Sequence, residues 1–258
     1  MSLWARWQRW REQRQLQRFA IPDALWHALL ANYPFVARRS AADLAELRRL
    51  CSLFLARKRF HTSGGLQLTD AMALAVAAQA CLPVLRLDLA LYDGTVGIVL
   101  HPGEVLAPRE EVDEHGVVHQ WDEVLAGEAM PGGPLMLSWE AVQQADDPEQ
   151  PVFNVVVHEF VHLLDLRHGG DANGLPEITD PVLRQRWLAE LPLAWDRFAD
   201  RVAHRESSCI DPYGSAALDE FFAVAAEAFF VAPQELRAED PPLYALLAAY
   251  FRQDPADA

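Results

Sequence analysis

The sequence contains few cysteines and little positive charge. Its 258 residues include three cysteines (Cys51, Cys81 and Cys209), and none of them forms a C-x-x-C pair. Such a small, odd number argues against a disulfide framework or a cysteine-based zinc site. The chain has 22 Lys and Arg against 37 Asp and Glu, a net charge of −15. Because non-specific nucleic-acid binding needs a basic surface, we expect no nucleic-acid partner.

Long apolar runs and internal repeats are also missing. No uninterrupted apolar stretch approaches the roughly 20 residues that a membrane-spanning helix needs, so we expect no transmembrane segment. The first residues lack the apolar core of a secretory signal. The apolar fraction of 51% is nevertheless enough for a substantial core. Together these features predict a globular protein of the reducing cytoplasm.

Residues 1–20 differ in composition from the rest of the chain. Three tryptophans alternate there with five arginines, and Glu12 is the only acid. A basic, tryptophan-bearing amphipathic helix could lie on an anionic membrane or bind a partner. Single amphipathic helices more often face a core, so we predict that these tryptophans pack on the main domain. We expect that domain to span residues 21–250 and a short tail to span residues 251–258.

Apolar periodicity predicts a mostly helical α+β chain. Capping residues and apolar stripes favour helices over about 22–30, 41–55, 70–81, 151–168, 181–206 and 218–230, with Pro192 ending or kinking one of them. The middle of the chain has strand-like segments at 84–92, 96–100, 116–118 and 134–139. The last of these could form an open sheet edge above a site or an ordinary paired strand.

The stretch Val155–Leu164 contains the pattern H-E-x-x-H within an apolar run. Because a helix advances 3.6 residues per turn, His158 and His162 project from one face. Two imidazoles at this spacing can bind one metal ion, usually zinc. Glu159 can act as a base on a metal-bound water without being a ligand. The pattern therefore predicts a hydrolase with one Zn²⁺ per chain.

A catalytic zinc site needs a third protein ligand, and two residues compete for that role. His168 completes a pattern close to that of metzincins, but Asp165 stands where that pattern has glycine, and no methionine follows the motif. Glu227 lies in an apolar helix, where a carboxylate is costly to bury unless it binds a metal or pairs with an arginine. Glu220 is seven residues earlier, close to the same face, and could hydrogen-bond a ligand histidine from outside the ligand set.

Several segments together resemble one known family. His158–Asp165 and Glu220–Phe230 are similar to the zinc-dependent peptidases related to Mlc titration factor A. Shorter similarities lie in Gly65–Asp70, Ala77–Cys81, Leu125–Ala129 and Gly133–Trp139, so that the resemblance runs from about Ile21 to Tyr250. It implies a zincin-like metallopeptidase fold of the α+β class, mostly helical, with a small mixed sheet over the active-site helix.

The resemblance also implies a function and a ligand set. It implies zinc on His158, His162 and Glu227 in the manner of gluzincins, Glu159 as the base, and aminopeptidase-like activity on a peptide or protein substrate. Because the founding member of the family binds the repressor Mlc, it further suggests a transcriptional repressor as a partner. An alternative function is a regulatory protein-binding module whose zinc is mainly structural and is held by four protein ligands.

The expected chemistry assigns roles to four side chains. Glu159 would accept the proton of a zinc-activated water and pass it to the leaving amine. Tyr213, in a loop before the Glu227 helix, could donate a hydrogen bond to the oxyanion or be an ordinary turn residue. Asp165 could orient a ligand histidine or be a structural acid at the end of its helix. Glu220 would support a ligand from outside the ligand set.

Overall fold

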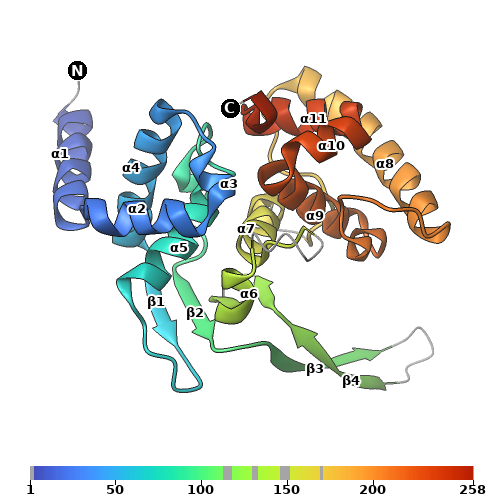
Figure 1. Ribbon diagram of the computed structural model, residues 1–258, viewed down its shortest axis with the longest axis horizontal. Coiled ribbons are helices and arrows are strands. Elements are labelled where there is room, and N and C mark those ends of the chain that lie inside the picture. The colour runs from blue at the N-terminus through green and yellow to red at the C-terminus, as the bar shows by residue number, and fades with distance from the viewer. Residues whose placement is uncertain (1–2, 113–117, 130–132, 146–151, 169–170, 258) are drawn as a thin grey trace.

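The computed structural model describes residues 3–112, 118–129, 133–145, 152–168 and 171–257 (Figure 1); within these ranges, residues 3–6, 8–9, 105–112, 118–125, 128–129 and 168 are described by their backbone. The first half of the chain forms α1 (Leu3–Arg18), α2 (Asp23–Asn32), α3 (Pro34–Ala37), α4 (Ala41–Arg57), β1 (Arg59–Thr62), α5 (Asp70–Cys81), η1 (Leu89–Tyr92), β2 (Gly97–His101), β3 (Val105–Val112), β4 (Val118–Leu125), β5 (Gly127–Ala129), β6 (Leu135–Ser138) and α6 (Trp139–Gln143). The second half forms α7 (Val155–Asp165), η2 (Leu166–His168), α8 (Pro181–Ala203), η3 (Pro212–Ser215), α9 (Leu218–Val231), α10 (Pro233–Glu239), α11 (Pro241–Phe251) and η4 (Pro255–Asp257).

The helices form two groups with α7 between them. Helices α1–α5 lie on one side in Figure 1 and α8–α11 on the other. Helix α7 packs against α5, β5 and β6 as well as against α9, and it therefore joins the two groups. The hairpin of β3 and β4 extends away from both groups. This arrangement confirms a mostly helical α+β protein.

A small sheet lies beside α7. Its strand order is β1-β2-β6-β5, with the first three strands parallel and β5 antiparallel to β6. Of the two possibilities for residues 134–139, the structure therefore has the paired strand, because β6 is hydrogen-bonded on both sides. The edge of the sheet next to α7 is instead β5.

The expected strand at residues 84–92 is wrong. Backbone bonds from Leu85 to Leu82 and from Leu87 to Val84 form turns, and η1 follows with Asp88 as its cap. Most of these apolar residues are buried, but hydrogen bonds between residues three apart pair their backbone locally, so no partner strand is needed. Apolar content alone did not distinguish this buried turn from a buried strand.

Two of the predicted helix starts are confirmed by their caps, whereas the helix expected from about residue 151 begins at Val155. Ser40 accepts a hydrogen bond from the amide of Asp43, and Thr69 accepts one from Met72, as expected for helices α4 and α5. Helix α8 continues through Pro192, which therefore does not end it. In the part of the chain that is described, no helix is long and apolar enough to cross a bilayer.

Candidate metal centre

Helix α7 presents the two histidines of the H-E-x-x-H pattern. The helix begins after Asn154, whose side chain accepts a hydrogen bond from the amide of Val157, a typical N-cap. Most residues of this helix are apolar and buried, whereas the side chains of His158 and His162 are each 12% exposed. Their Nε2 atoms lie 3.1 Å apart. The local spacing of the sequence therefore brings both imidazoles to one point.

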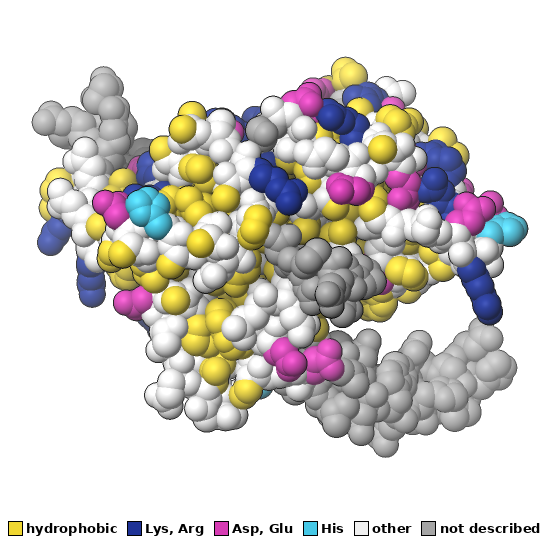
Figure 2. Space-filling view, viewed as in Figure 1, with side chains coloured by type: hydrophobic (Ala, Val, Ile, Leu, Met, Phe, Trp, Pro, Cys, Tyr) yellow, Lys and Arg dark blue, Asp and Glu magenta, His cyan; other side chains and the backbone are white. Residues whose placement is uncertain are grey.

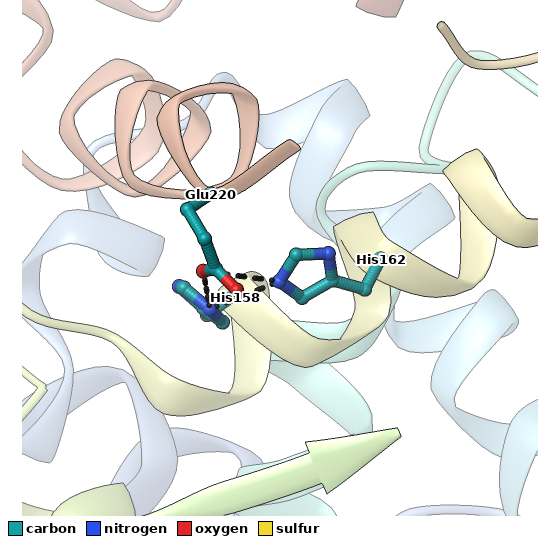
Figure 3. Close-up of side chains that lie close together, drawn as sticks. All are labelled: His158, His162 and Glu220. Carbon is teal, nitrogen blue, oxygen red and sulfur yellow. Dashed lines mark hydrogen bonds and ion pairs between the residues drawn. The ribbon is translucent and has the colours of Figure 1, made fainter. Parts of the chain in front are cut away.

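Helix α9 brings two glutamates to His158 from different sides. Glu220 Oε2 lies 3.2 Å from His158 Nε2 and 3.4 Å from His162 Nε2 (Figure 3). Glu227 is completely buried and lies 2.7 Å from the other ring nitrogen, Nδ1 of His158. Its second oxygen accepts a hydrogen bond from the backbone N–H of Asn154. Glu227 thus links α9 to the start of α7, whereas Glu220 faces the two Nε2 atoms.

The group formed by His158, His162 and Glu220 has the dimensions of a metal site. One donor atom from each residue lies within 4.8 Å of the other two. Tetrahedral zinc bonds of about 2.0–2.1 Å would place donor atoms roughly 3.3 Å apart, close to the observed 3.1, 3.2 and 3.4 Å. Within the described residues, the buried Oε2 of Glu220 accepts no aligned hydrogen bond. A divalent cation would satisfy these three donor atoms, so the residues fit the zinc ion that the sequence predicts.

The hydrogen bond from His158 to Glu227 favours metal binding by the opposite ring nitrogen. A carboxylate next to Nδ1 holds the proton there and leaves the lone pair of Nε2 directed at the site. This assignment of the tautomer follows from the two partners. Glu227 therefore orients and polarises the imidazole of His158, which is the role that the sequence analysis gave to Glu220.

Burial and charge both shift the acids and histidines of this centre. Burial lowers the pKa of His158, but the neighbouring carboxylates of Glu220 and Glu227 outweigh burial and hold its pKa well above the ordinary value. Burial raises the pKa of Glu227 and of Glu159, and the neighbouring histidines oppose the rise. Burial also raises the pKa of Glu220, but its contacts with both histidines outweigh burial and lower the pKa below the ordinary value. Glu220 is therefore the anionic member of the group.

Glu159 lies under the edge of the sheet. Its side chain is buried, with 6% exposed. A Cβ atom placed on Gly127 of β5 would come within 2.6 Å of its Oε1 and 2.8 Å of a methyl group of Val155. Gly127 is therefore required for β5 to approach the predicted base this closely. The sequence analysis quoted Gly127 only as part of a family resemblance and gave it no role.

Tyr213 lies beside His158. It belongs to η3, and its ring centroid is 6.3 Å from that of His158. The residue is 52% exposed. The backbone of the turn is held by Asp211, whose carboxylate accepts the amide N–H of Tyr213. The position is compatible with the predicted oxyanion role.

Asp165 has a different partner from the one expected. Its Oδ2 accepts hydrogen bonds from the amides of Asn173 and Gly174, at 2.8 and 2.7 Å. Gly174 has a φ of +75°, and its carbonyl accepts a hydrogen bond from Trp187 of α8. A Cβ on Gly174 would lie 2.9 Å from the carbonyl oxygen of Leu218, where α9 begins. These contacts favour the structural alternative, in which Asp165 fixes the loop that supports the Glu220 helix.

The third ligand is where structure and sequence analysis differ most. The sequence favoured Glu227, and the geometry favours Glu220, because it is Glu220 that approaches both Nε2 atoms. The competing residue His168 ends η2, and its side chain lies outside the described residues. The sequence signal for Glu220 was weak, because both glutamates lie near one face of the same apolar helix.

Two histidines and a glutamate grouped in this way, with a buried second glutamate beside them, could hold a metal ion. Residues 7–252 match the family described as glucose-regulated metallo-peptidase M90. The chain belongs to this family, and it shares its metallopeptidase classification. A metal ion is therefore implied at the centre.

Named relatives are similar over most of their length. Mlc titration factor A of Yersinia pestis (strain Pestoides F) is 33% identical over 234 residues, which cover 90% of this chain and 85% of the relative. Mlc titration factor A of Yersinia pseudotuberculosis serotype O:1b (strain IP 31758) gives the same values. The predicted resemblance to the family related to Mlc titration factor A is confirmed.

Proposed function

We propose that this protein is a zinc-dependent peptidase with a zincin-like fold, in which His158, His162 and Glu220 hold one zinc ion. The observation that carries the proposal is the approach of Glu220 to both Nε2 atoms, at distances that suit tetrahedral zinc. Glu227 takes the supporting role behind His158. The ligand set remains of the gluzincin type, with two histidines and a glutamate, but the glutamate is not the one that the sequence favoured.

A bound zinc ion would supply a Lewis acid that lowers the pKa of a water molecule. Glu159 is the proposed general base, which accepts a proton from the attacking water and gives it to the leaving amine. Burial raises the pKa of Glu159, and a carboxylate with a raised pKa is a better proton acceptor. The hydroxyl group of Tyr213 is the proposed donor to the oxygen that becomes negative on the scissile carbonyl.

The edge strand β5 supports a peptide as the substrate. Among the described strands, β5 is paired only with β6, so its other side can bond to an extended chain. Gly127 of this strand approaches Glu159 closely. A peptide added along β5 would therefore pass next to the proposed base. The family resemblance favours aminopeptidase-like cleavage, which peptides with free and blocked N-termini distinguish.

The variant Glu159→Gln tests the proposed chemistry. Glu159 is a base rather than a ligand in this proposal, so the variant should keep its zinc. Its rate of peptide hydrolysis should fall by about 10²–10⁴-fold. Zinc content by elemental analysis and a fluorogenic peptide panel, with and without a chelator, measure both quantities. Hydrolysis at the wild-type rate would show that Glu159 is not the base.

A second candidate function is the titration of a repressor, because the relatives are named Mlc titration factor A. In that case the zinc site would serve mainly to stabilise the fold. A binding assay with purified Mlc, with wild type and Glu159→Gln in parallel, separates the two functions. Binding that is unaffected by the variant, together with no hydrolysis of any peptide by wild type, would favour the regulatory module.

A further inference from the structure

The outer face of α1 carries two exposed tryptophans. Trp7 and Trp10 each have 51% of their surface exposed. The sequence analysis expected the tryptophans of this helix to pack on the main domain, and for these two residues that expectation is wrong. The side chain of Trp4 lies outside the described residues. Large exposed indoles on a surface helix need an explanation, because burying them would be favourable.

Arginines lie on the same face as these tryptophans. At 100° per residue, positions 7, 10, 11, 14 and 18 of a helix fall within an arc of about 100°. The guanidinium group of Arg11 lies 4.8 Å from the ring centre of Trp7, and that of Arg14 lies 4.8 Å from Trp10. We call this face, formed by Trp7, Trp10, Arg11, Arg14 and Arg18, the α1 stripe. It combines flat apolar rings with cationic groups.

The opposite face of α1 attaches the helix to the protein. Leu16 packs against the hydrophobic core, and Glu12 forms an ion pair with Arg49 of α4. On the helical wheel, both positions point away from the α1 stripe. Figure 1 shows α1 at the outer edge of the molecule, beside α4. The stripe is therefore directed outward by contacts on the other side of the helix.

The charge of α1 is opposite to that of the remaining chain. Five arginines and one glutamate fall within α1, so 17 of the 22 basic residues and 36 of the 37 acidic residues lie elsewhere. Because Arg49 already neutralises Glu12, the arginines of the stripe have no acid of their own helix beside them. Lys and Arg side chains are visible at this edge in Figure 2. With five arginines and one glutamate, α1 therefore has a net charge of +4 in a chain whose net charge is −15.

We propose that the α1 stripe binds the surface of an anionic phospholipid membrane. A tryptophan ring is apolar with one polar N–H and suits the boundary between lipid headgroups and acyl chains. The neighbouring guanidinium groups can bind lipid phosphates while their stems lie along the rings. The acidic remainder of the chain is repelled by the same surface, so contact is limited to this edge.

Sedimentation of the full-length protein with vesicles tests the proposal. Phosphatidylcholine vesicles are compared with vesicles of phosphatidylcholine and phosphatidylglycerol in equal parts, at low salt and at about 1 M salt, where the Debye length is roughly 3 Å. Wild type should bind the anionic vesicles at low salt and should bind neither kind at high salt. Replacing Arg11, Arg14 and Arg18 by Gln should weaken binding by about fivefold per arginine, or on the order of 100-fold together.

Two further variants separate the stripe from general effects of exposed residues. Trp7→Ala/Trp10→Ala should weaken binding by about tenfold or more, because two apolar rings are lost. Arg184→Gln/Leu188→Gln on α8 is the matched control, since Leu188 is 48% exposed and both residues are on a surface helix. This control should bind like wild type. Circular dichroism and zinc content check that every variant is folded.

Three results would overturn the proposal. One is equal binding of wild type to neutral and anionic vesicles, or none to either. Another is wild-type affinity in both stripe variants, or an equal loss in the α8 control. The third is the finding that the α1 stripe is needed for self-association, measured by sedimentation velocity, or for DNA binding, measured by a filter assay, while the protein binds no lipid.

Discussion

The exchange of roles between Glu220 and Glu227 gives the sharpest test of the proposed centre. Glu220→Ala should strip zinc and abolish hydrolysis, because it leaves two histidines, too few for a stable catalytic zinc site. Glu227→Ala should keep the ligand set and weaken zinc affinity or activity by about 10–100-fold, as expected for a partner of a ligand histidine. Elemental analysis and peptide hydrolysis measure both variants.

The stability of the metal-free protein separates the two glutamates in a second way. Glu227 is completely buried and accepts hydrogen bonds from His158 and from the backbone of Asn154. Its removal leaves two buried donors without a partner, at about 1–3 kcal/mol each, or roughly 2–6 kcal/mol in total. That is a large share of a typical unfolding free energy of about 5–15 kcal/mol. Denaturant unfolding in the presence of a chelator should show this loss for Glu227→Ala.

Matched variants complete the design. Asp219→Ala removes an acid one residue before Glu220 on the same helix and should keep both zinc and activity. Glu227→Gln retains one acceptor oxygen and should recover part of the stability. His168→Asn should keep stoichiometric zinc. Full zinc in Glu220→Ala together with a metal-free Glu227→Ala would refute the reasoning and restore the ligand set that the sequence favoured.

Three further predictions concern Gly127, Tyr213 and Glu239. Gly127→Ala should lower activity at least tenfold with little loss of zinc, because its Cβ would displace the Glu159 carboxylate; wild-type kinetics would exclude this contact. Tyr213→Phe should lower kcat by about 10²–10³-fold with KM almost unchanged. A rise in KM of the same size with kcat unchanged would instead indicate a role in substrate binding. Burial raises the pKa of Glu239, but bonds from Ser208, Arg201 and the Cys209 amide outweigh burial and lower it. The charged Glu239 therefore stabilises the fold at pH values above its ordinary pKa of about 4.5, and this stabilisation is lost as pH falls through the folded pKa. Glu239→Gln should lower the unfolding free energy at pH 7 by about 1–3 kcal/mol and by less in acid. A loss of unfolding free energy that is independent of pH would contradict this prediction.

The sequence by itself determined the local parts of the centre. The four-residue spacing of His158 and His162 places both imidazoles on one face of any helix, and Glu159 follows from the same motif. Capping residues defined the starts of helices such as α4 and α5, because a cap is a bond between residues three apart in sequence. The family resemblance was equally available from short segments of the chain. These features depend on neighbours in the sequence.

Only the tertiary structure decided between the two glutamates. Glu220 and Glu227 are seven residues apart, about two turns and roughly 10 Å along α9, and both lie near one face. Which of them meets Nε2 and which meets Nδ1 of His158 depends on how α9 is placed along α7. The approach of Gly127 to Glu159 and the outward face of α1 likewise depend on packing between elements. Helical periodicity states which side chains share a face, whereas the position of the neighbouring element decides what that face contacts.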